Sequence, residues 1–268
     1  MKSDFLDTAR SLAQRAAHEV LSLLHQPIHQ ERKQDKSLVT AADLKSDEII
    51  REGLREAFPS HAILTEENGI SGPENAEYVW LVDPLDGTKA FAKGVAGFSV
   101  MVGLLKHGTP VLGVVIDPLE GHVYEAIQGE GAFHTLNGQK TRIEVSSRDQ
   151  FPEMRLVVST GFPEDKMLAL QKTLTGPRLA PINSVGIKVG IVVRQEADIY
   201  INHHSVHYWD TCAPQVILEE AGGVFTKLDG SKLRYDLKTG FSHHALTLVS
   251  NGRRHAELAG LVSGVMRD

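Results

Sequence analysis

Apolar residues near the start of the chain recur every three or four positions, which is the period of an amphipathic helix. We therefore predict a helix from residue 4 to about residue 25, ended before Pro27. Its apolar stripe consists of Phe5, Ala9, Leu12, Ala16, Val20 and Leu23. A second helix is predicted from Thr40, a residue type that caps helices, to about Phe58.

After Pro59 the apolar residues fall in short runs instead, as expected for strands. Gly108, Gly121 and Gly138 lie between or after these runs as turn formers, so a mainly antiparallel sheet is predicted across residues 60–145. The runs are Ala62 to Leu64, Val79 to Val82, Phe98 to Leu105, Val111 to Ile116 and Val123 to Ile127.

Strand-like and helical segments alternate after about residue 156, which is typical of an α/β arrangement. Strands are predicted at Leu156 to Ser159 and Ile199 to Asn202, and a helix at Val185 to Arg194. Another helix is predicted after Asp210, with Pro214 in its first turn. We place a boundary between two halves near residue 145.

The composition indicates an ordinary globular protein. The chain has 268 residues, 41% hydrophobic and 23% charged, with no stretch apolar enough to span a bilayer. The first residues do not form a signal peptide, and the single Cys212 is consistent with a reducing compartment, so we expect a cytoplasmic protein. A net charge of -6 argues against binding to polymeric nucleic acid, whereas a small anionic substrate stays open if bound cations supply positive charge.

The segment from Trp80 to Lys89 is the most informative, because an apolar strand ends there in Asp83 and Asp86, three residues apart. With the carbonyl of Leu85 they form an oxygen-only set, which suits Mg²⁺ better than Zn²⁺. The alternative is a turn in which both acids only cap backbone groups.

Three further acids each have an ordinary structural interpretation when taken alone. Glu66 follows a short strand and resembles a solvated surface acid, Asp210 resembles a helix N-cap, and Asp43 lies three residues after Thr40 in a capping-box pattern. Their order along the chain is what favours a shared site.

Four separated motifs occur in the order and spacing of the lithium-sensitive, magnesium-dependent phosphatases, a superfamily that includes inositol monophosphatases and fructose-1,6-bisphosphatases. They are Thr40-Ala-Ala-Asp43, Thr65-Glu66-Glu67, Asp83-Pro-Leu-Asp86-Gly-Thr88 and Trp209-Asp210. The resemblance runs from about Lys33 to Gly223. It implies the layered αβαβα fold of that superfamily, with residues 1–145 as an α+β half carrying most metal ligands and residues 146–268 as an α/β half.

Within this superfamily the chain most resembles the 3′(2′),5′-bisphosphate nucleotidases of the CysQ type. The segments that carry this likeness are Lys33 to Asp43, Asp83 to Lys89 and Trp209 to Pro214. Inositol monophosphatases usually place a Glu seven residues before the final metal-binding Asp, where this chain has His203. Nucleotidases commonly have Glu where this chain has Ala90.

The resemblance implies two or three Mg²⁺ ions per active site. Glu66, Asp83 and the Leu85 carbonyl would hold one ion, and Asp83, Asp86 and Asp210 a second. Asp43 and Thr88 would orient and deprotonate the attacking water. Substrate-binding residues would be Glu66, Leu85, Asp86, Gly87, Thr88, Ser184, Gly186, Lys188 and Asp210.

Two features of the second half can each be interpreted in two ways. Lys188 would contact a second phosphate or the sugar, or else be an exposed helical lysine. His203, His204 and His207 lie near Cys212, but their spacing lacks a zinc motif, so these histidines are expected to line the leaving-group pocket instead.

The leading hypothesis is removal of the 3′-phosphate of adenosine 3′,5′-bisphosphate, giving AMP, by a monomer or homodimer. A phosphatase acting on inositol, histidinol or sugar phosphates is the second hypothesis. A non-catalytic metabolite sensor is the third, although every carboxylate that the mechanism needs is present.

Overall fold

The computed structural model describes residues 2–24, 26, 30–32 and 38–267, so the part of the nucleotidase-like segment from Lys33 to Ser37 lies outside the described residues. The helices α1 (Lys2–Leu24) and α2 (Ala41–Ala57) fall where the apolar period predicts them. Thr40 caps α2 as expected, through a capping box with Asp43. The short strands β1 (Gln30–Arg32) and β2 (Leu38–Thr40) pair antiparallel just before α2.

The larger sheet is mainly antiparallel, as the alternation of short apolar runs predicts. Its strands are ordered β10-β9-β8-β7-β6-β5-β3-β4, and only β3 and β5 run parallel. They are β3 (Ala62–Thr65), β4 (Gly69–Ser71), β5 (Tyr78–Asp86), β6 (Ser99–Lys106), β7 (Thr109–Ile116), β8 (Val123–Ile127), β9 (Gly131–Leu136) and β10 (Gln139–Ile143). The short helix α3 (Thr88–Phe91) follows β5.

The rest of the chain forms a smaller four-stranded sheet, in the order β11-β12-β14-β13, with helices around it. Its elements are η1 (Phe151–Glu153), β11 (Leu156–Val158), α4 (Glu164–Leu174), α5 (Val185–Val193), β12 (Ile199–Asn202), α6 (Tyr208–Glu220), β13 (Val224–Lys227), β14 (Thr247–Ser250) and α7 (His255–Arg267).

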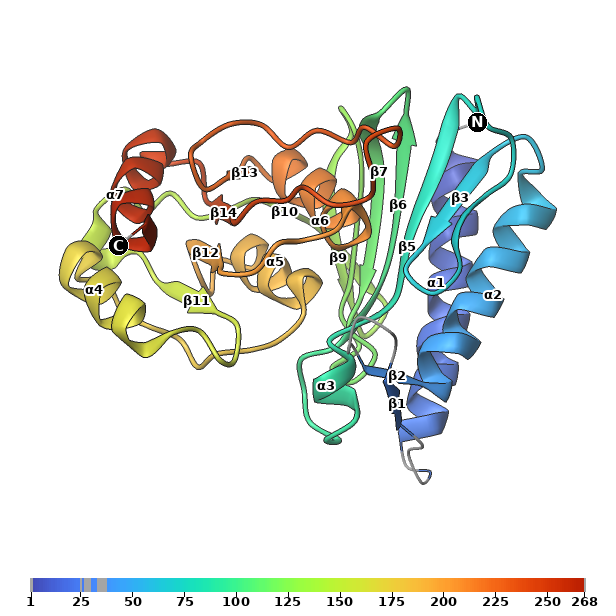
Figure 1. Cartoon of the computed structure of the whole chain (residues 1–268), viewed down its shortest axis with the longest axis horizontal. Helices are drawn as coiled ribbons and strands as arrows, with labels where there is room; N and C mark the ends of the chain where they lie inside the picture. Colours follow the sequence, from blue (N-terminus) through green and yellow to red (C-terminus); the bar gives the residue numbers. More distant parts are fainter. Residues whose placement is uncertain (1, 25, 27–29, 33–37, 268) are drawn as a thin grey trace.

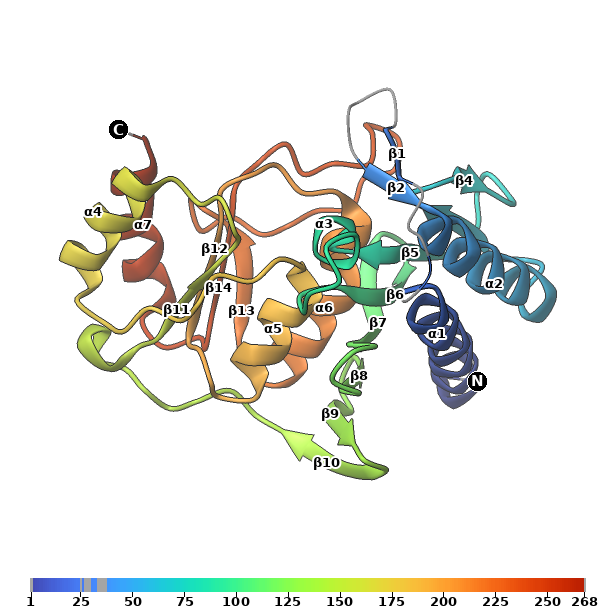
Figure 2. The same ribbon diagram turned by 90° about the horizontal axis from the view of Figure 1, so that it is seen from below.

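These elements stack as five layers, which confirms the predicted αβαβα fold (Figure 1). The pair α1 and α2 covers one face of the larger sheet, α5 and α6 lie between the two sheets, and α4 and α7 cover the outer face of the smaller sheet (Figures 1 and 2). The larger sheet ends at Ile143 and the smaller begins at Leu156. The helices α5 and α6 contact strands of both sheets, so these contacts do not divide the chain into two halves. The boundary near residue 145 therefore stays a prediction.

One helix start was predicted wrongly. Helix α6 begins at Tyr208 with His207 as its N-cap, so Asp210 lies inside the first turn and Pro214 in the second. The Asp210 side chain accepts a hydrogen bond from the backbone N–H of His207, 2.7 Å away. Asp210 therefore serves as the reciprocal residue of a capping box rather than as the cap itself.

Within the described residues, none of the helices has the length and apolarity needed to cross a membrane.

Two glycines on neighbouring strands bring α6 close to the larger sheet. Gly103 and Gly113 are paired across β6 and β7. A Cβ atom on Gly103 would meet the Cys212 sulfur at 2.6 Å, and one on Gly113 would clash with the backbone of Ala213. The missing side chains thus set the depth at which α6, and with it Asp210, lies against the sheet.

We expect Gly113→Ala to destabilise the protein by about 1–3 kcal/mol, because the added methyl meets helix backbone that has no room to move. Urea unfolding followed by circular dichroism measures the change. Gly260→Ala is the matched control, since Gly260 lies exposed on α7 with no heavy atom within 4 Å of an added Cβ. Its stability should stay equal or rise by up to about 1 kcal/mol. Equal stability of wild type and Gly113→Ala would contradict the packing argument.

Candidate active site

The motif from Asp83 to Thr88 departs from regular strand geometry between its two carboxylates, Asp83 and Asp86. Pairing of β5 with β6 shifts register between Asp83 and Asp86, and the Asp83 side chain is buried. Gly87 then turns the chain into α3 with a φ of 92°, and a Cβ there would clash with the carbonyl of Gly97. Both requirements at this position select glycine.

Thr88 and Asp43, predicted as a pair, are in direct contact. The Thr88 hydroxyl lies 2.9 Å from Asp43 Oδ1 and 3.1 Å from the Leu85 carbonyl oxygen, both of which accept hydrogen bonds. The other oxygen of Asp43 accepts from the N–H and hydroxyl of Thr40, at 2.8 and 2.6 Å. Burial raises the pKa of Asp43, opposed by the hydrogen bonds from Thr40 and Thr88. Asp43 thus takes part in the capping box of α2 and also accepts a hydrogen bond from Thr88.

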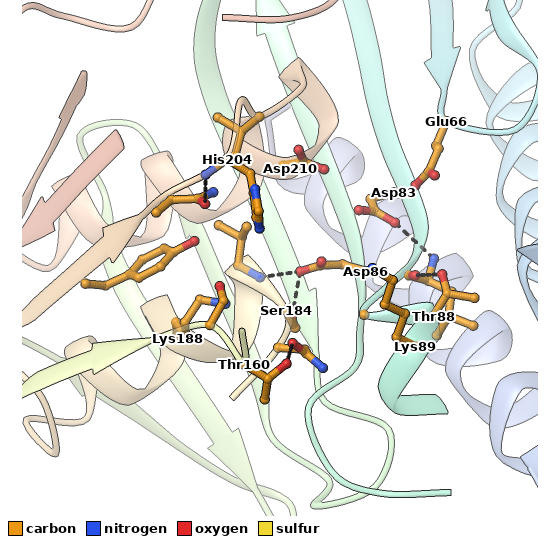
Figure 3. A pocket seen from close by; sticks show the side chains of 18 of the residues that line it. Glu66, Asp83, Asp86, Thr88, Lys89, Thr160, Ser184, Lys188, His204 and Asp210 are labelled. Carbon is orange, nitrogen blue, oxygen red and sulfur yellow. Dashed lines mark hydrogen bonds between the residues drawn. The ribbon is translucent and has the colours of Figure 1, made fainter. Parts of the chain in front are cut away.

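Four carboxylates from three parts of the chain line one pocket of about 410 Å³, namely Glu66, Asp83, Asp86 and Asp210 (Figure 3). Glu66 follows β3, and its backbone N–H donates to the Val82 carbonyl, 3.2 Å away. Leu85, Gly87, Thr88, Ser184 and Lys188 also line this pocket. Asp43 and Gly186 are not among its lining residues, and Asp43 reaches the pocket through Thr88.

Two of these acids, Asp83 and Asp210, have raised pKa values. Burial is the first cause for both Asp83 and Asp210 and holds each pKa well above its usual range. Repulsion adds to this, from Glu66, Asp86 and Asp210 at Asp83 and from Asp86 and Glu66 at Asp210. Such a set of oxygen donors fits a hard divalent cation, which would replace the repulsion by attraction.

The carboxylates share the pocket without forming a finished coordination shell. Among the described residues, no three His, Cys, Asp or Glu side chains converge in an arrangement that could already hold a metal ion. This also applies to the histidines near Cys212, which is itself fully buried. Of those histidines only His204 lines the pocket, so the expectation is wrong for the other two. The His203 ring lies against His204, and His207 stacks on Trp209.

Asp86 connects β5 of the larger sheet to the start of α5. Its Oδ2 accepts hydrogen bonds from the Ser184 hydroxyl at 2.6 Å and from the N–H groups of Val185 and Gly186 at 2.5 and 3.2 Å. Ser184, the N-cap of α5, is buried. The structure ties Ser184 and Gly186 to Asp86, and their contact with a substrate stays a prediction.

Lys188 is buried, with only 1% of its surface exposed, so the interpretation as an exposed helical lysine is wrong. Its ammonium donates to the Ile182 carbonyl at 3.2 Å and lies 4.8 Å from the centre of the Tyr200 ring. Burial lowers the pKa of Lys188 to about 8, opposed by the nearby Asp86 and Asp210. A cation therefore faces the pocket on the side opposite the strand β5 (Figure 3).

The remaining lining residues were not predicted from the sequence, apart from His204. Lys89 comes from α3, and the others come from β12, the start of α5 and the loops after β11: Ser159, Thr160, Asn183, Val185, Tyr200, Asn202, Ser205 and Val206. Asn202 ends strand β12 as Asp83 and Asp86 lie at the end of β5, and this position was the one usable signal. The others lack a local pattern because they meet only in the folded chain.

Comparison with known proteins shows the family. The model of the inositol monophosphatase family matches residues 1–266. The chain is 29% identical to the 3′(2′),5′-bisphosphate nucleotidase CysQ of Aggregatibacter actinomycetemcomitans, over 90% of this chain and 91% of that one. It is 32% identical to the chloroplastic phosphatase IMPL1 of Arabidopsis thaliana, over 94% of this chain and 68% of that one.

A solved structure supports the same assignment. The inositol monophosphatase from Anabaena (Nostoc) sp. PCC 7120 matches with a TM-score of 0.79 and 29% identity, over 98% of this chain and 96% of that one. Since the family model spans almost all of the sequence, this chain belongs to the inositol monophosphatase family and is a phosphatase of that kind.

Proposed function

We propose that this phosphatase is Mg²⁺-dependent and removes the 3′-phosphate of adenosine 3′,5′-bisphosphate, giving AMP and phosphate. The observation that carries the proposal is the pocket itself, in which four carboxylates face a buried lysine. The carboxylates suit cations that bind one phosphate, and Lys188 suits a second anionic group. The name of the CysQ relative supports the same substrate class.

Glu66, Asp83 and the Leu85 carbonyl would hold one Mg²⁺, and Asp83, Asp86 and Asp210 a second, with Asp83 shared. When bound, such ions neutralise the phosphoryl oxygens and polarise the attacking water. The protein's part is to present the oxygens. Asp86 keeps its orientation through three donors at the start of α5, and Asp210 through the N–H of His207.

Thr88 and Asp43 would move the proton. The Thr88 hydroxyl lines the pocket and donates to Asp43 Oδ1, which turns an oxygen lone pair toward a water in the pocket. A proton taken by Thr88 Oγ passes on to Asp43, the general base. The N–H groups of Gly87 and Thr88 lie at the start of α3 and would meet the phosphate there.

Inositol phosphate is the second candidate, because a solved inositol monophosphatase matches 98% of the chain. Phosphate release from adenosine 3′,5′-bisphosphate beside inositol-1-phosphate separates the two. We expect Mg²⁺-dependent release with kcat/KM at least about tenfold higher for the nucleotide, a barrier difference of about 1.4 kcal/mol. EDTA should abolish release and Li⁺ should lower it. Equal or faster release from inositol-1-phosphate would overturn the nucleotide assignment, and tight nucleotide binding without release would indicate a sensor.

Asp83→Asn should have opposite effects on activity and on stability. Loss of the shared charge is expected to leave less than a tenth of the wild-type rate at saturating Mg²⁺. Because folding raises the pKa of Asp83, ionising it opposes folding, and the metal-free wild type should lose stability as pH rises toward neutral. In EDTA at pH 7, Asp83→Asn should therefore have a higher Tm than wild type.

Asp117→Asn is the control for this variant, since Asp117 is a buried acid outside the pocket that caps Leu119 and Glu120. Its specific activity should stay near that of wild type. Retention of more than about a tenth of the rate by Asp83→Asn, a change of about 1.4 kcal/mol, would contradict the shared-ligand role.

Lys188→Gln tests the second anionic group. We expect kcat/KM to fall at least about tenfold for adenosine 3′,5′-bisphosphate and much less for adenosine 3′-monophosphate, which lacks the second phosphate. With a pKa of about 8, Lys188 is charged below that pH and neutral above it, so KM for the bisphosphate should rise above pH 8. Equal losses for the two nucleotides would place Lys188 in the support of Asp86 instead.

A further inference from the structure

Three buried polar residues, Asp43, Ser46 and Asp47, share one face of α2. Their spacing of three and four residues puts them side by side on the helix. Such a face usually carries apolar residues, and each buried polar group is costly unless it is hydrogen-bonded. Each of the three side chains makes a hydrogen bond to a segment that holds part of the pocket. Asp43 contacts Thr88, as described above.

Ser46 holds the segment between the two aspartates of the motif. Its hydroxyl donates to the Pro84 carbonyl, 2.7 Å away, and the residue is fully buried. Pro84 lies where the pairing of β5 with β6 is irregular, next to both Asp83 and Leu85. The bond from α2 therefore fixes the backbone at a point where the sheet constrains it least.

Asp47 holds the turn that carries Glu66. Its Oδ2 accepts from the side-chain amide of Asn68 at 2.6 Å and from Arg51 Nε at 3.2 Å. The N–H of Asn68 in turn donates to the Thr65 hydroxyl, 3.0 Å away. Glu66 lies between Thr65 and Asn68 in the sequence. Its backbone N–H donates a hydrogen bond to the carbonyl of Val82, the residue before Asp83. The turn is thus tied to α2 at one end and to β5 at the other.

Burying the Asp47 carboxylate costs free energy, because one of its oxygens lacks a hydrogen-bond partner among the described residues. No part of the residue is exposed, and its Oδ1 has no hydrogen-bond partner among the described residues. Neither Ser46 nor Asp47 lines the pocket. Ser46 contacts the segment from Asp83 to Leu85, and Asp47 contacts the turn that carries Glu66. Any effect of Ser46 and Asp47 on the pocket must therefore pass through these two segments.

We propose that Asp47 and Ser46 are positioning residues, which hold the Glu66 turn and the Asp83–Leu85 segment in place for Mg²⁺. The inference rests on the proposed function only in taking these carboxylates as Mg²⁺ ligands. It assigns to α2 the task of keeping mutually repelling acids at a fixed separation before the cation arrives.

The test uses Asp47→Ala, Asn68→Ala and the double variant in the full chain. One readout is the Mg²⁺ concentration for half-maximal rate, and the other is the rise in Tm caused by Mg²⁺ without substrate. We expect each single variant to raise the half-saturating Mg²⁺ at least about tenfold and to reduce the Tm rise, while kcat at saturating Mg²⁺ changes less than about threefold. The double variant should be no worse than the worse single one, because Asp47 acts through Asn68.

Asp47→Asn, which keeps an oxygen able to accept from Asn68, should recover part of the Mg²⁺ affinity. Ser46→Ala should likewise raise the Mg²⁺ requirement. Glu48→Gln is the matched control on α2, because Glu48 is exposed and forms its ion pair with Lys45, at 2.6 Å, rather than with a segment of the pocket. It should behave as wild type. If Asp47→Ala fails to fold, Asn68→Ala carries the same expectation.

Wild-type Mg²⁺ dependence in both single variants, or a loss of kcat that excess Mg²⁺ does not restore, would overturn the proposal. Additive effects in the double variant would also overturn it. The Tm readout needs no substrate, so the positioning role stands or falls even if adenosine 3′,5′-bisphosphate is not hydrolysed. Absence of any Mg²⁺ effect on the wild-type Tm would overturn it as well.

Discussion

The gathering of the buried Asp83 and the partly buried Asp210 with other carboxylates is the constraint on which this structure depends. Burial and repulsion from neighbouring carboxylates raise the pKa values of Asp83 and Asp210, so their ionised forms are unfavourable without a compensating cation. Acids that repel one another cannot gather by themselves. Their separation must be set by backbone that is held rigid for other reasons, and the rest of the fold supplies this backbone.

Each segment that carries one of these carboxylates is fixed by a different kind of contact. Asp83 lies near the end of β5, a strand buried over most of its length. Asp210 depends on the depth of α6, which the paired glycines of β6 and β7 allow to approach the sheet. Asp86 is held by the start of α5. Errors in any one of these contacts would shift one oxygen relative to the others, so the precision of the site is distributed over the whole chain.

Local sequence patterns were sufficient where one short segment decides the structure. The first two helices and the cap at Thr40 followed from spacing and residue type. The start of α6 did not, because Asp at the third helical position and Asp at the cap give similar signals. Strand β10 was missed because its residues, Gln139 to Arg142, are polar and exposed.

Burial that depends on distant packing could not be predicted from the sequence. Lys188 looks like a surface lysine along the chain and is buried only because α5 lies between two sheets. Ser46 and Asp47 likewise look like solvent-facing helix residues until the Pro84 and Asn68 contacts exist. Phosphate chemistry is therefore readable from the motifs of β5 and α2, which are local. Lys188, Tyr200, His204 and their neighbours share no local motif, and only the tertiary structure brings them into one pocket. For this reason the family of the chain follows directly from its motifs. Its substrate must instead be argued from the residues that line the pocket across from β5.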